Sequence, residues 1–404
     1  MKLDELGFVG RGKSKHRPRN DPSLYGGQYP FVQTGDVKGA DLWLSHYTQT
    51  YNETGLAQSK LWPAGTLCIT IAANIAETAI LKIPACFPDS IVGFIAHKEK
   101  ADARFVKYYI DIIKLRMQNV SKGTTQDNLS VDKLLSFDFD VPDYPLQERI
   151  ASILCAYDDL IENNTRRIKI LEEMAQRIYR EWFVNFRFPG HEKVKMVDSE
   201  IGPIPLGWKP SSVGELARDE RRNVQPSGLN QETPYIGLEH MPRRSIALSE
   251  WGVVGKVQSN KLAFRDGEIL FGKIRPYFHK VGIAPINGVC SSDIVVILPR
   301  RPEWLSVVLC CVSSRDFVNQ ATQTSQGTKM PRANWDVLTR YPIPLPEERI
   351  LTRFSEIILP IIDLIRNLVF SNRNLRQTRD LLLPKLISGE IRVESFEPEA
   401  VAQT

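Results

Sequence analysis

The chain has 404 residues, of which 42% are apolar, 25% charged and 9% aromatic, close to the average soluble globular protein. This composition excludes a disordered or collagen-like protein. The six cysteines are scattered and have no zinc-site spacing, which excludes a disulfide framework and gives no sign of structural zinc. The formal net charge of +5 suits a nucleic-acid-binding protein and an ordinary enzyme equally. No apolar run reaches the roughly 18 residues of a membrane span, and the N-terminal pattern is not that of a secretion signal. We therefore expect a cytoplasmic protein.

Short apolar runs bounded by glycine and proline predict strands. In chain order they lie at 67–72, 79–83, 91–95, 268–271 and 294–298. Helices are predicted at 105–115 and 304–312. The segments 1–145 and 190–345 are therefore expected to form two α+β globules.

A heptad pattern of apolar residues follows each globular segment, from 150 to 182 and from 354 to 386. It is typical of a helix that presents a narrow stripe to one partner helix. Pro360 is expected to kink or divide the second helix. We predict an intramolecular antiparallel pair, with two amphipathic helices on separate cores as the alternative. The predicted seam residues are Leu154, Tyr157, Ile161, Asn164, Ile168, Leu171, Ile178, Ile361, Ile365, Leu368, Asn372, Leu375 and Leu382.

The sequence repeats itself at an offset of about 200 residues. Ser121-Lys-Gly-Thr-Thr recurs as Ser325-Gln-Gly-Thr-Lys, and Leu3-Asp-Glu-Leu6 resembles Val213-Gly-Glu-Leu216. The order of the matches is kept along the whole chain. The sequence therefore predicts one unit of about 200 residues that is present twice.

Catalytic signatures are absent from the sequence, with one partial match. Gly7 to Ser14 fits the phosphate-loop pattern, but that mechanism needs a buried strand before it and a helix after it. Charged residues precede Gly7, and Pro18 disfavours a helix start. No nucleophile elbow, zinc-protease motif or adenine-methyltransferase motif occurs. We expect no catalytic residue, no bound cofactor and no metal in this chain.

The positive charge is concentrated in the two globular segments. Residues 1–126 hold 16 Lys and Arg against 11 Asp and Glu, and residues 201–332 hold 17 against 11. The helical segments 127–200 and 333–404 are acidic or close to neutral. Lys and Arg are the usual contacts to DNA phosphates, so each globule is a candidate nucleic-acid-binding domain.

Three kinds of segment supply candidate DNA contacts. In the first globule, five basic residues lie at every second position, so on an extended backbone they would all point to the same side. A solvated loop is the alternative. They are Arg11, Lys13, Lys15, Arg17 and Arg19. In the second globule, basic and aromatic residues interleave in Lys273, Arg275, Tyr277, His279 and Lys280, and Arg221 and Arg222 form a less specific pair.

The third kind consists of two matched loops whose amide and hydroxyl groups suit base edges, although turn or helix capping explains them equally. The candidates there are Lys122, Thr124, Thr125, Gln126, Asn128, Gln326, Thr328, Lys329 and Arg332.

Two basic globules, each followed by a similar helical segment, resemble the specificity subunit of type I restriction–modification systems. The likeness covers essentially the whole chain. It is carried by Gly-Thr-Thr-Gln-Asp-Asn-Leu129, Pro-Leu-Gln-Glu-Arg-Ile150, Arg-Ile-Tyr-Arg-Glu-Trp-Phe183, Ile-Pro-Leu-Gly-Trp208 and Leu-Leu-Pro-Lys-Leu-Ile-Ser-Gly-Glu-Ile391.

The resemblance implies target recognition domains at 1–145 and 190–345 and helical conserved regions at 146–189 and 346–404. Each recognition domain would read one half of a split, asymmetric DNA site, and the helices would pair as a spacer. Two methylation subunits carrying S-adenosylmethionine would dock and methylate adenine, and restriction subunits using ATP and magnesium would join them. This chain would be the non-catalytic DNA-recognition subunit. The alternatives are a coiled-coil scaffold with two interaction domains and an enzyme that uses the Gly7–Ser14 loop.

Overall fold

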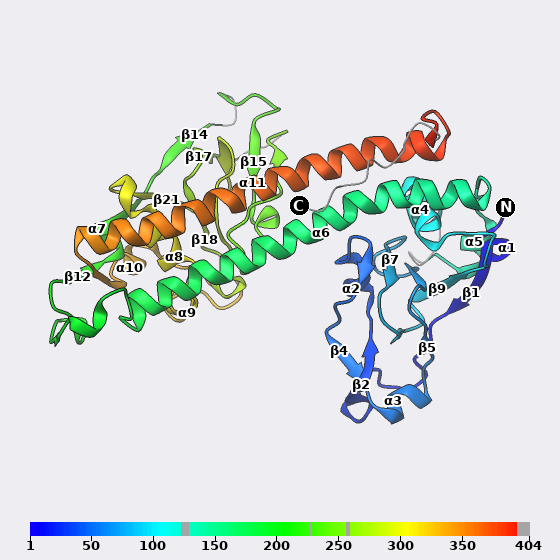
Figure 1. Ribbon diagram of the computed structural model, residues 1–404, viewed down its shortest axis with the longest axis horizontal. Coiled ribbons are helices and arrows are strands. Elements are labelled where there is room, and N and C mark those ends of the chain that lie inside the picture. Colours follow the sequence, from blue (N-terminus) through cyan, green and yellow to red (C-terminus); the bar gives the residue numbers. More distant parts are fainter. Residues whose placement is uncertain (123–128, 226–227, 256–258, 394–404) are drawn as a thin grey trace. The chain divides into compact units, whose positions relative to one another are not determined.

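The computed structural model describes the chain except for residues 123–128, 226–227, 256–258 and 394–404 (Figure 1). The chain forms two compact units: unit 1 is Met1–Glu162 with Asn374–Thr404, and unit 2 is Asn163–Arg373. Two long helices, α6 (Tyr144–Tyr179) and α11 (Glu348–Ile387), each contribute one part to unit 1 and the other part to unit 2. Each unit therefore joins a globular segment to portions of both helices.

Unit 1 contains two β-sheets. The larger sheet has the strand order β1 (Gly7–Arg11), β9 (Ile91–Ala96), β6 (Leu67–Thr70), β7 (Thr78–Leu81) and β3 (Trp43–Leu44). The smaller sheet has the order β4 (Gln49–Tyr51), β2 (Tyr25–Phe31), β8 (Ala85–Cys86) and β5 (Leu61–Trp62). Neighbouring strands are antiparallel except for the parallel pairs β3–β7 and β2–β8. The helices of this unit are α1 (Leu3–Leu6), α2 (Thr34–Lys38), α3 (Glu53–Ala57), α4 (Ala103–Lys122) and α5 (Val131–Ser136).

Unit 2 also contains two main sheets. One has the order β13 (Ala217–Asp219), β21 (Ile294–Pro299), β18 (Ile269–Gly272) and β19 (Val281–Ile283). The other has the order β14 (Arg222–Val224), β17 (Lys261–Phe264), β20 (Gly288–Cys290), β15 (Pro234–Ile236) and β16 (Gly252–Val253). Two short ladders pair β10 (Met196–Val197) with β11 (Ile204–Pro205) and β12 (Lys209–Ser212) with β22 (Pro342–Leu345). The helices are α7 (Val213–Leu216), α8 (Leu305–Val312), α9 (Arg315–Gln323) and α10 (Trp335–Leu338).

The two units share one topology, which confirms the internal repeat. The order β1-β9-β6-β7 in unit 1 corresponds to β13-β21-β18-β19 in unit 2, and α1 and α7 precede the matching edge strands. The order β4-β2-β8-β5 corresponds to β16-β15-β20-β17, including the parallel central pair, and unit 2 adds β14 at one edge. Even the turns agree, because Gly65 and Gly267 both have a positive φ, 84° and 81°, which favours glycine.

The elements predicted from apolar runs are present. The strands expected at 67–72, 79–83 and 91–95 are β6, β7 and β9, and those at 268–271 and 294–298 are β18 and β21. Nearly all of their residues are buried, as expected for sheets covered on both faces. The helix predicted at 105–115 is part of α4, and the one predicted at 304–312 contains the whole of α8.

Helices α6 and α11 run antiparallel in each unit. In unit 1, Asp158 pairs with Arg379, while Leu154, one turn earlier on α6, shares a core with Leu386, later on α11. In unit 2, the side-chain Nδ2 of Asn164 donates to Oδ1 of Asn372 at 3.0 Å, and Trp182 packs against Phe354 with ring centroids 5.6 Å apart. Contacts at higher residue numbers on one helix thus meet lower residue numbers on the other, as in an antiparallel pair.

Every predicted seam residue is buried or half-buried, as expected from the heptad pattern. The seam is only part of the buried surface, because the same helices also complete the cores of the globular units. The two interpretations of the pattern, a helix pair and helices covering separate cores, therefore both apply to this chain.

The polar seam residues Asn164 and Asn372 form a closed hydrogen-bonded group. Besides their mutual bond, Asn164 Nδ2 contacts Ser371 Oγ at 3.5 Å, and Asn372 Nδ2 donates to Thr165 Oγ1 at 3.2 Å. Both amides are at least nine-tenths buried. A sliding helix would leave these buried groups unpaired, which is costly, so the pair fixes the register.

Pro360 does not divide α11, so the predicted division is wrong. The helix continues from Glu348 to Ile387, and Pro360 lies on its exposed side together with Glu356. The carbonyl of Glu356 loses its intrahelical donor to the proline, and at this exposed position water can replace that hydrogen bond.

Replacing Ile365 by Asp should destabilise the chain by about 3–5 kcal/mol, because a carboxylate would be buried without a partner. Ile365 is fully buried in the unit 2 core. The neighbouring Leu364 is 37% exposed, so Leu364→Asp is the matched control, with an expected change within about 0.5 kcal/mol. Urea unfolding measures both variants. Equal effects of the two substitutions would contradict the placement of the seam.

Candidate functional site

The basic stripe of unit 1 continues from strand β1. From Arg11 to Arg17 the odd-numbered residues are exposed and the even-numbered ones are buried or half-buried. The backbone stays extended against its neighbours, since Gly12 N donates to Ile91 O at 2.9 Å and Lys13 N to Phe87 O at 3.1 Å. Lys13 and Lys15 thus project to solvent on the same side as Arg11 and Arg17.

Asp89 gathers three of the arginines in the stripe. Arg19 forms an ion pair with its carboxylate at 2.5 Å, Arg17 approaches it at 4.0 Å, and the guanidinium of Arg11 donates to its backbone carbonyl. One carboxylate cannot neutralise three guanidinium groups together with two lysines. The surface therefore keeps a local excess of positive charge, and its arginines are held in place.

Beside the stripe, Lys60 and Phe8 form a basic and aromatic pair that sequence reasoning missed. Lys60 Nζ lies 3.7 Å from the ring centroid of Trp62 and 4.6 Å from that of Phe8, within cation–π range. Burial, with a smaller contribution from the charge of Lys13, lowers the pKa of Lys60. Phe8 is 49% exposed on strand β1. The signal in the sequence is an aromatic residue shortly before a basic run.

The candidate loop after α4 cannot be placed. Lys122 ends that helix, but the structure does not describe its side chain, and Thr124, Thr125, Gln126 and Asn128 lie outside the described residues. These positions stay predictions.

In unit 2, the structure separates the two neighbouring candidates Arg221 and Arg222. Arg222 makes a two-pronged ion pair with the buried carboxylate of Glu268, one prong at 2.9 Å, and also donates to Ala263 O. The hydrogen bond to Glu268 raises the pKa of Arg222. Its guanidinium is therefore an internal structural group. Arg221 is 65% exposed and is bound to Asp219 at 2.6 Å, so it remains at the surface.

The basic and aromatic segment 273–280 forms a tight turn between β18 and β19. Arg275 and His279 have positive φ values of 48° and 52° and flank a 3-10 turn, Pro276–Phe278. His279 Nε2 lies 2.9 Å from Ser313 O, and Lys280 Nζ donates to Leu238 O. Burial lowers the pKa of both His279 and Lys280. The neutral imidazole favoured at pH 7 makes His279 a support for the turn rather than a cation for phosphate.

The loop 326–332 lies against this turn, although the two are about fifty residues apart in sequence. Arg275 N donates to Pro331 O at 2.7 Å, and Ala333 N donates to Lys273 O at 2.9 Å. The loop is closed by reciprocal backbone bonds between Gln326 and Arg332. Its exposed candidates are Gln326, Thr328, Lys329 and Arg332, of which Arg332 also faces Asp293 at 3.4 Å. The structure thus brings two predicted segments together into one surface.

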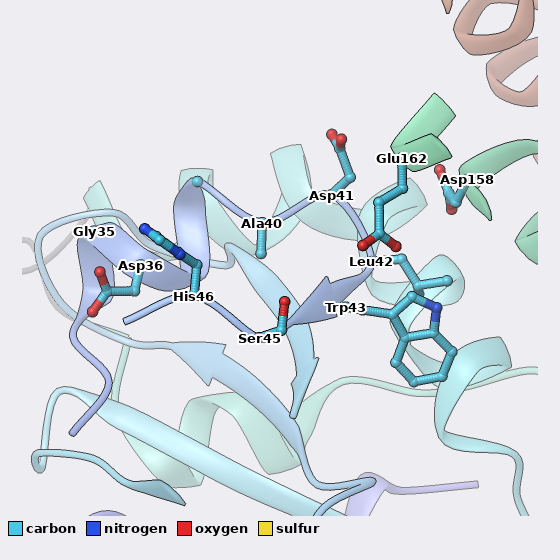
Figure 2. Close-up of a pocket in the computed structure, with 11 residues that line it drawn as sticks. Gly35, Asp36, Ala40, Asp41, Leu42, Trp43, Ser45, His46, Asp158 and Glu162 are labelled. Atoms are coloured by element: carbon cyan, nitrogen blue, oxygen red, sulfur yellow. The ribbon is translucent and has the colours of Figure 1, made fainter. Parts of the chain in front are cut away.

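A pocket of about 290 Å³ in unit 1 lies between α2, β3 and α6 (Figure 2). Figure 2 shows Asp41, Asp158 and Glu162 toward one side of it and Asp36 with His46 toward the other. Its carboxylates have structural partners: Asp158 accepts from Tyr108 and Arg379, and Asp36 accepts from Gln33 N at 2.8 Å. An acidic lining repels phosphate, so the pocket is not part of a nucleic-acid-binding surface.

Comparisons with known proteins agree on one family. Residues 1–173 match the model of the type I restriction modification DNA specificity domain. The chain is 24% identical to the MjaIX specificity subunit of Methanocaldococcus jannaschii, over 98% of this chain and 94% of the relative. Over nearly its whole length the chain is therefore similar to type I specificity subunits. A further specificity subunit, EcoDI from Escherichia coli, is 30% identical over 49% of this chain and 45% of its own length.

The fold of this chain has a solved counterpart. The S subunit structure from M. genitalium is similar with a TM-score of 0.58, at 13% identity, over 96% of this chain and 95% of that one. Within the described ranges, no three His, Cys, Asp or Glu side chains are grouped to hold a metal ion. No helix in the described parts is long and apolar enough to cross a membrane.

The structural assignment of Arg222 is testable. Arg222→Ala should lower the free energy of unfolding by about 3–5 kcal/mol, because it leaves the buried Glu268 carboxylate without its partner. Arg265→Ala, which removes an exposed guanidinium from the same part of unit 2, is the control and should change it by less than about 0.5 kcal/mol. Denaturant titration of the two variants compares them. Unchanged stability in Arg222→Ala would mean that this arginine is free for ligand contact.

Proposed function

We propose that this chain is a specificity subunit that binds a bipartite, asymmetric site in duplex DNA and directs adenine methylation and restriction by partner subunits. The observation that carries the proposal is the two-sheet architecture, which is present twice in one chain with different exposed basic residues in each copy. Two similar but non-identical domains suit a site with two non-identical halves. Each domain would supply phosphate contacts from its basic residues and base contacts from its loops.

The long helices support a spacer role within this proposal. Helix α6 has 36 residues, which corresponds to about 54 Å at 1.5 Å per residue. One turn of DNA is about 34 Å, the distance by which two reading modules on one face of a duplex are separated. A helix of this length can serve two separated half-sites, and the Asn164–Asn372 pair would hold the spacer at one fixed length.

In the proposed complex, this chain supplies recognition and its partners supply chemistry. Two methylation subunits would bring S-adenosylmethionine, and restriction subunits would bring ATP and magnesium. The recognition domains would be residues 1–145 and 190–345, with helical regions at 146–189 and 346–404 for assembly, and the complex would act in the cytoplasm on cellular DNA.

A domain exchange tests the bipartite proposal. Replacing residues 1–145 with the corresponding domain of another family member should change one half of the methylated sequence and leave the other half intact. Sequencing of methylated adenines in a host that expresses the whole complex measures this. A change in both halves, or in neither, would contradict the assignment of one domain to each half.

The stripe of unit 1 should contribute to affinity without setting specificity. Lys13→Ala and Lys15→Ala should each weaken duplex binding and reduce the slope of log K against log salt by about 0.9, because each removes one phosphate contact. Lys98→Ala, at an exposed lysine outside the stripe, is the control with an unchanged slope. Binding of a fluorescent duplex at several salt concentrations measures the slopes. A chain that ignores duplex DNA at low salt would instead support the scaffold alternative.

A further inference from the structure

The two units carry different side chains at one pair of equivalent turns. In unit 1, residues 71–77 connect β6 to β7, and in unit 2, residues 273–280 connect β18 to β19. The backbones match closely: Thr70 N donates to Glu77 O, as Gly272 N donates to Lys280 O. The carbonyl at the start of each turn accepts an equivalent amide, from Leu129 in unit 1 and from Ala333 in unit 2.

The unusual backbone conformations of the turn are also shared. Ala73 and Ala76 have φ values of 64° and 60°, and the equivalent Arg275 and His279 have 48° and 52°. Positive φ is uncommon outside glycine and costs free energy. Because both units keep it, the conformation belongs to the architecture of the repeat. Unit 2 differs in that its turn is one residue longer, contains the 3-10 turn Pro276–Phe278 and carries a different set of side chains.

Those side chains have opposite character in the two units. Segment 71–77 reads Ile-Ala-Ala-Asn-Ile-Ala-Glu, with no basic residue and one acid, Glu77, which is bound to Lys114 at 2.7 Å. Segment 273–280 reads Lys-Ile-Arg-Pro-Tyr-Phe-His-Lys. One turn therefore has no cation to offer DNA, and the other has several.

In unit 2, three side chains of the turn are held by neighbouring residues. His279 and Lys280 are occupied by Ser313 O and Leu238 O, and Phe278 lies under the guanidinium of Arg243 at 4.0 Å. Tyr277 is 49% exposed. Arg275 is half-buried: its Nε is buried without a hydrogen-bond partner, and its Nη2 donates to Lys329 O in the adjoining loop at 3.4 Å. The donors of Arg275 that remain for a ligand are therefore those on its two Nη atoms.

We propose that Arg275 and Tyr277 are specificity-determining residues of the second recognition domain, and that the first domain does not read DNA with its equivalent turn. This inference rests on the proposed function. A fixed arginine can bond guanine O6 and N7 with two parallel donors, and a rigid aromatic ring beside it contacts bases by its face or edge. The first domain would read its half-site from another surface, next to the stripe that contains Lys13 and Lys15.

The test uses the whole complex, with methylated adenines sequenced in a host that expresses it. Arg275→Ala and Tyr277→Ala should each make one half of the recognised sequence degenerate and leave the other half unchanged. On a duplex of the original sequence, methylation should fall by about 5- to 150-fold, as expected for the loss of one base-specific contact. Asn74→Ala, in the equivalent turn of unit 1, is the matched control and should leave both halves unchanged.

Arg275→Lys separates base reading from a purely structural role. It keeps a positive charge but cannot form the two-pronged contact, so the melting temperature should stay that of the wild type while one half-site still becomes degenerate. Retention of both half-sites in Arg275→Lys and Tyr277→Ala, at unchanged melting temperature, would overturn the inference. A degenerate first half-site in Asn74→Ala would also overturn it, because both turns would then read DNA.

Failure of the proposed function has a different signature. If the wild-type complex methylates no split sequence and does not prefer any duplex, the proposed function is wrong whatever the variants do. If the wild type recognises a split site that all variants keep, the bipartite function stands and only the assignment of Arg275 and Tyr277 fails.

Discussion

The antiparallel pairing of α6 and α11 is the contact on which both units depend. In unit 1, Leu154 of α6 and Leu386 of α11 belong to the same core as Phe105 of α4. In unit 2, Trp182 and Phe354 occupy the corresponding place beside the sheet residues. Neither globular segment therefore closes its hydrophobic core with its own residues. The helices therefore contribute to the folding free energy of both units.

Duplication explains how one chain can hold two different surfaces on the same scaffold. The strand order, the parallel central pair and the positive-φ turns are common to both units. These features fix the backbone, and a fixed backbone leaves exposed turn residues free to change at little cost to stability. Ala73 and Arg275 occupy equivalent positions with opposite consequences for an approaching phosphate. The burial pattern thus explains both why the two units keep the same core architecture and why their exposed turn residues differ.

The sequence predicts periodic features well because they depend on short-range burial. The seam around Ile161 and Ile365 and the strands at 67–72 and 294–298 follow from period and apolarity alone. Pro360 was misjudged because its tolerance depends on which helix face is exposed, a tertiary property. The candidate site is predicted less completely, since the role of Arg222 is set by Glu268, a partner 46 residues away. The cation–π contact of Lys60 with Phe8 likewise needs the fold to bring β1 and β5 together.

Counting charges overstates the surface available to DNA. Arg222, His279 and Lys280 all count as basic residues in the sequence of unit 2. In the structure each is bound to an internal acceptor, and burial also favours the neutral form of His279. A cationic side chain that is bound to an internal acceptor must break that hydrogen bond or ion pair before it can contact a phosphate. Where the acceptor is buried, the acceptor is then left without a partner. Lys13, Lys15 and Arg275 carry no such cost, because they are exposed or keep spare donors. Recognition is therefore expected from few residues, each positioned by several that never touch DNA.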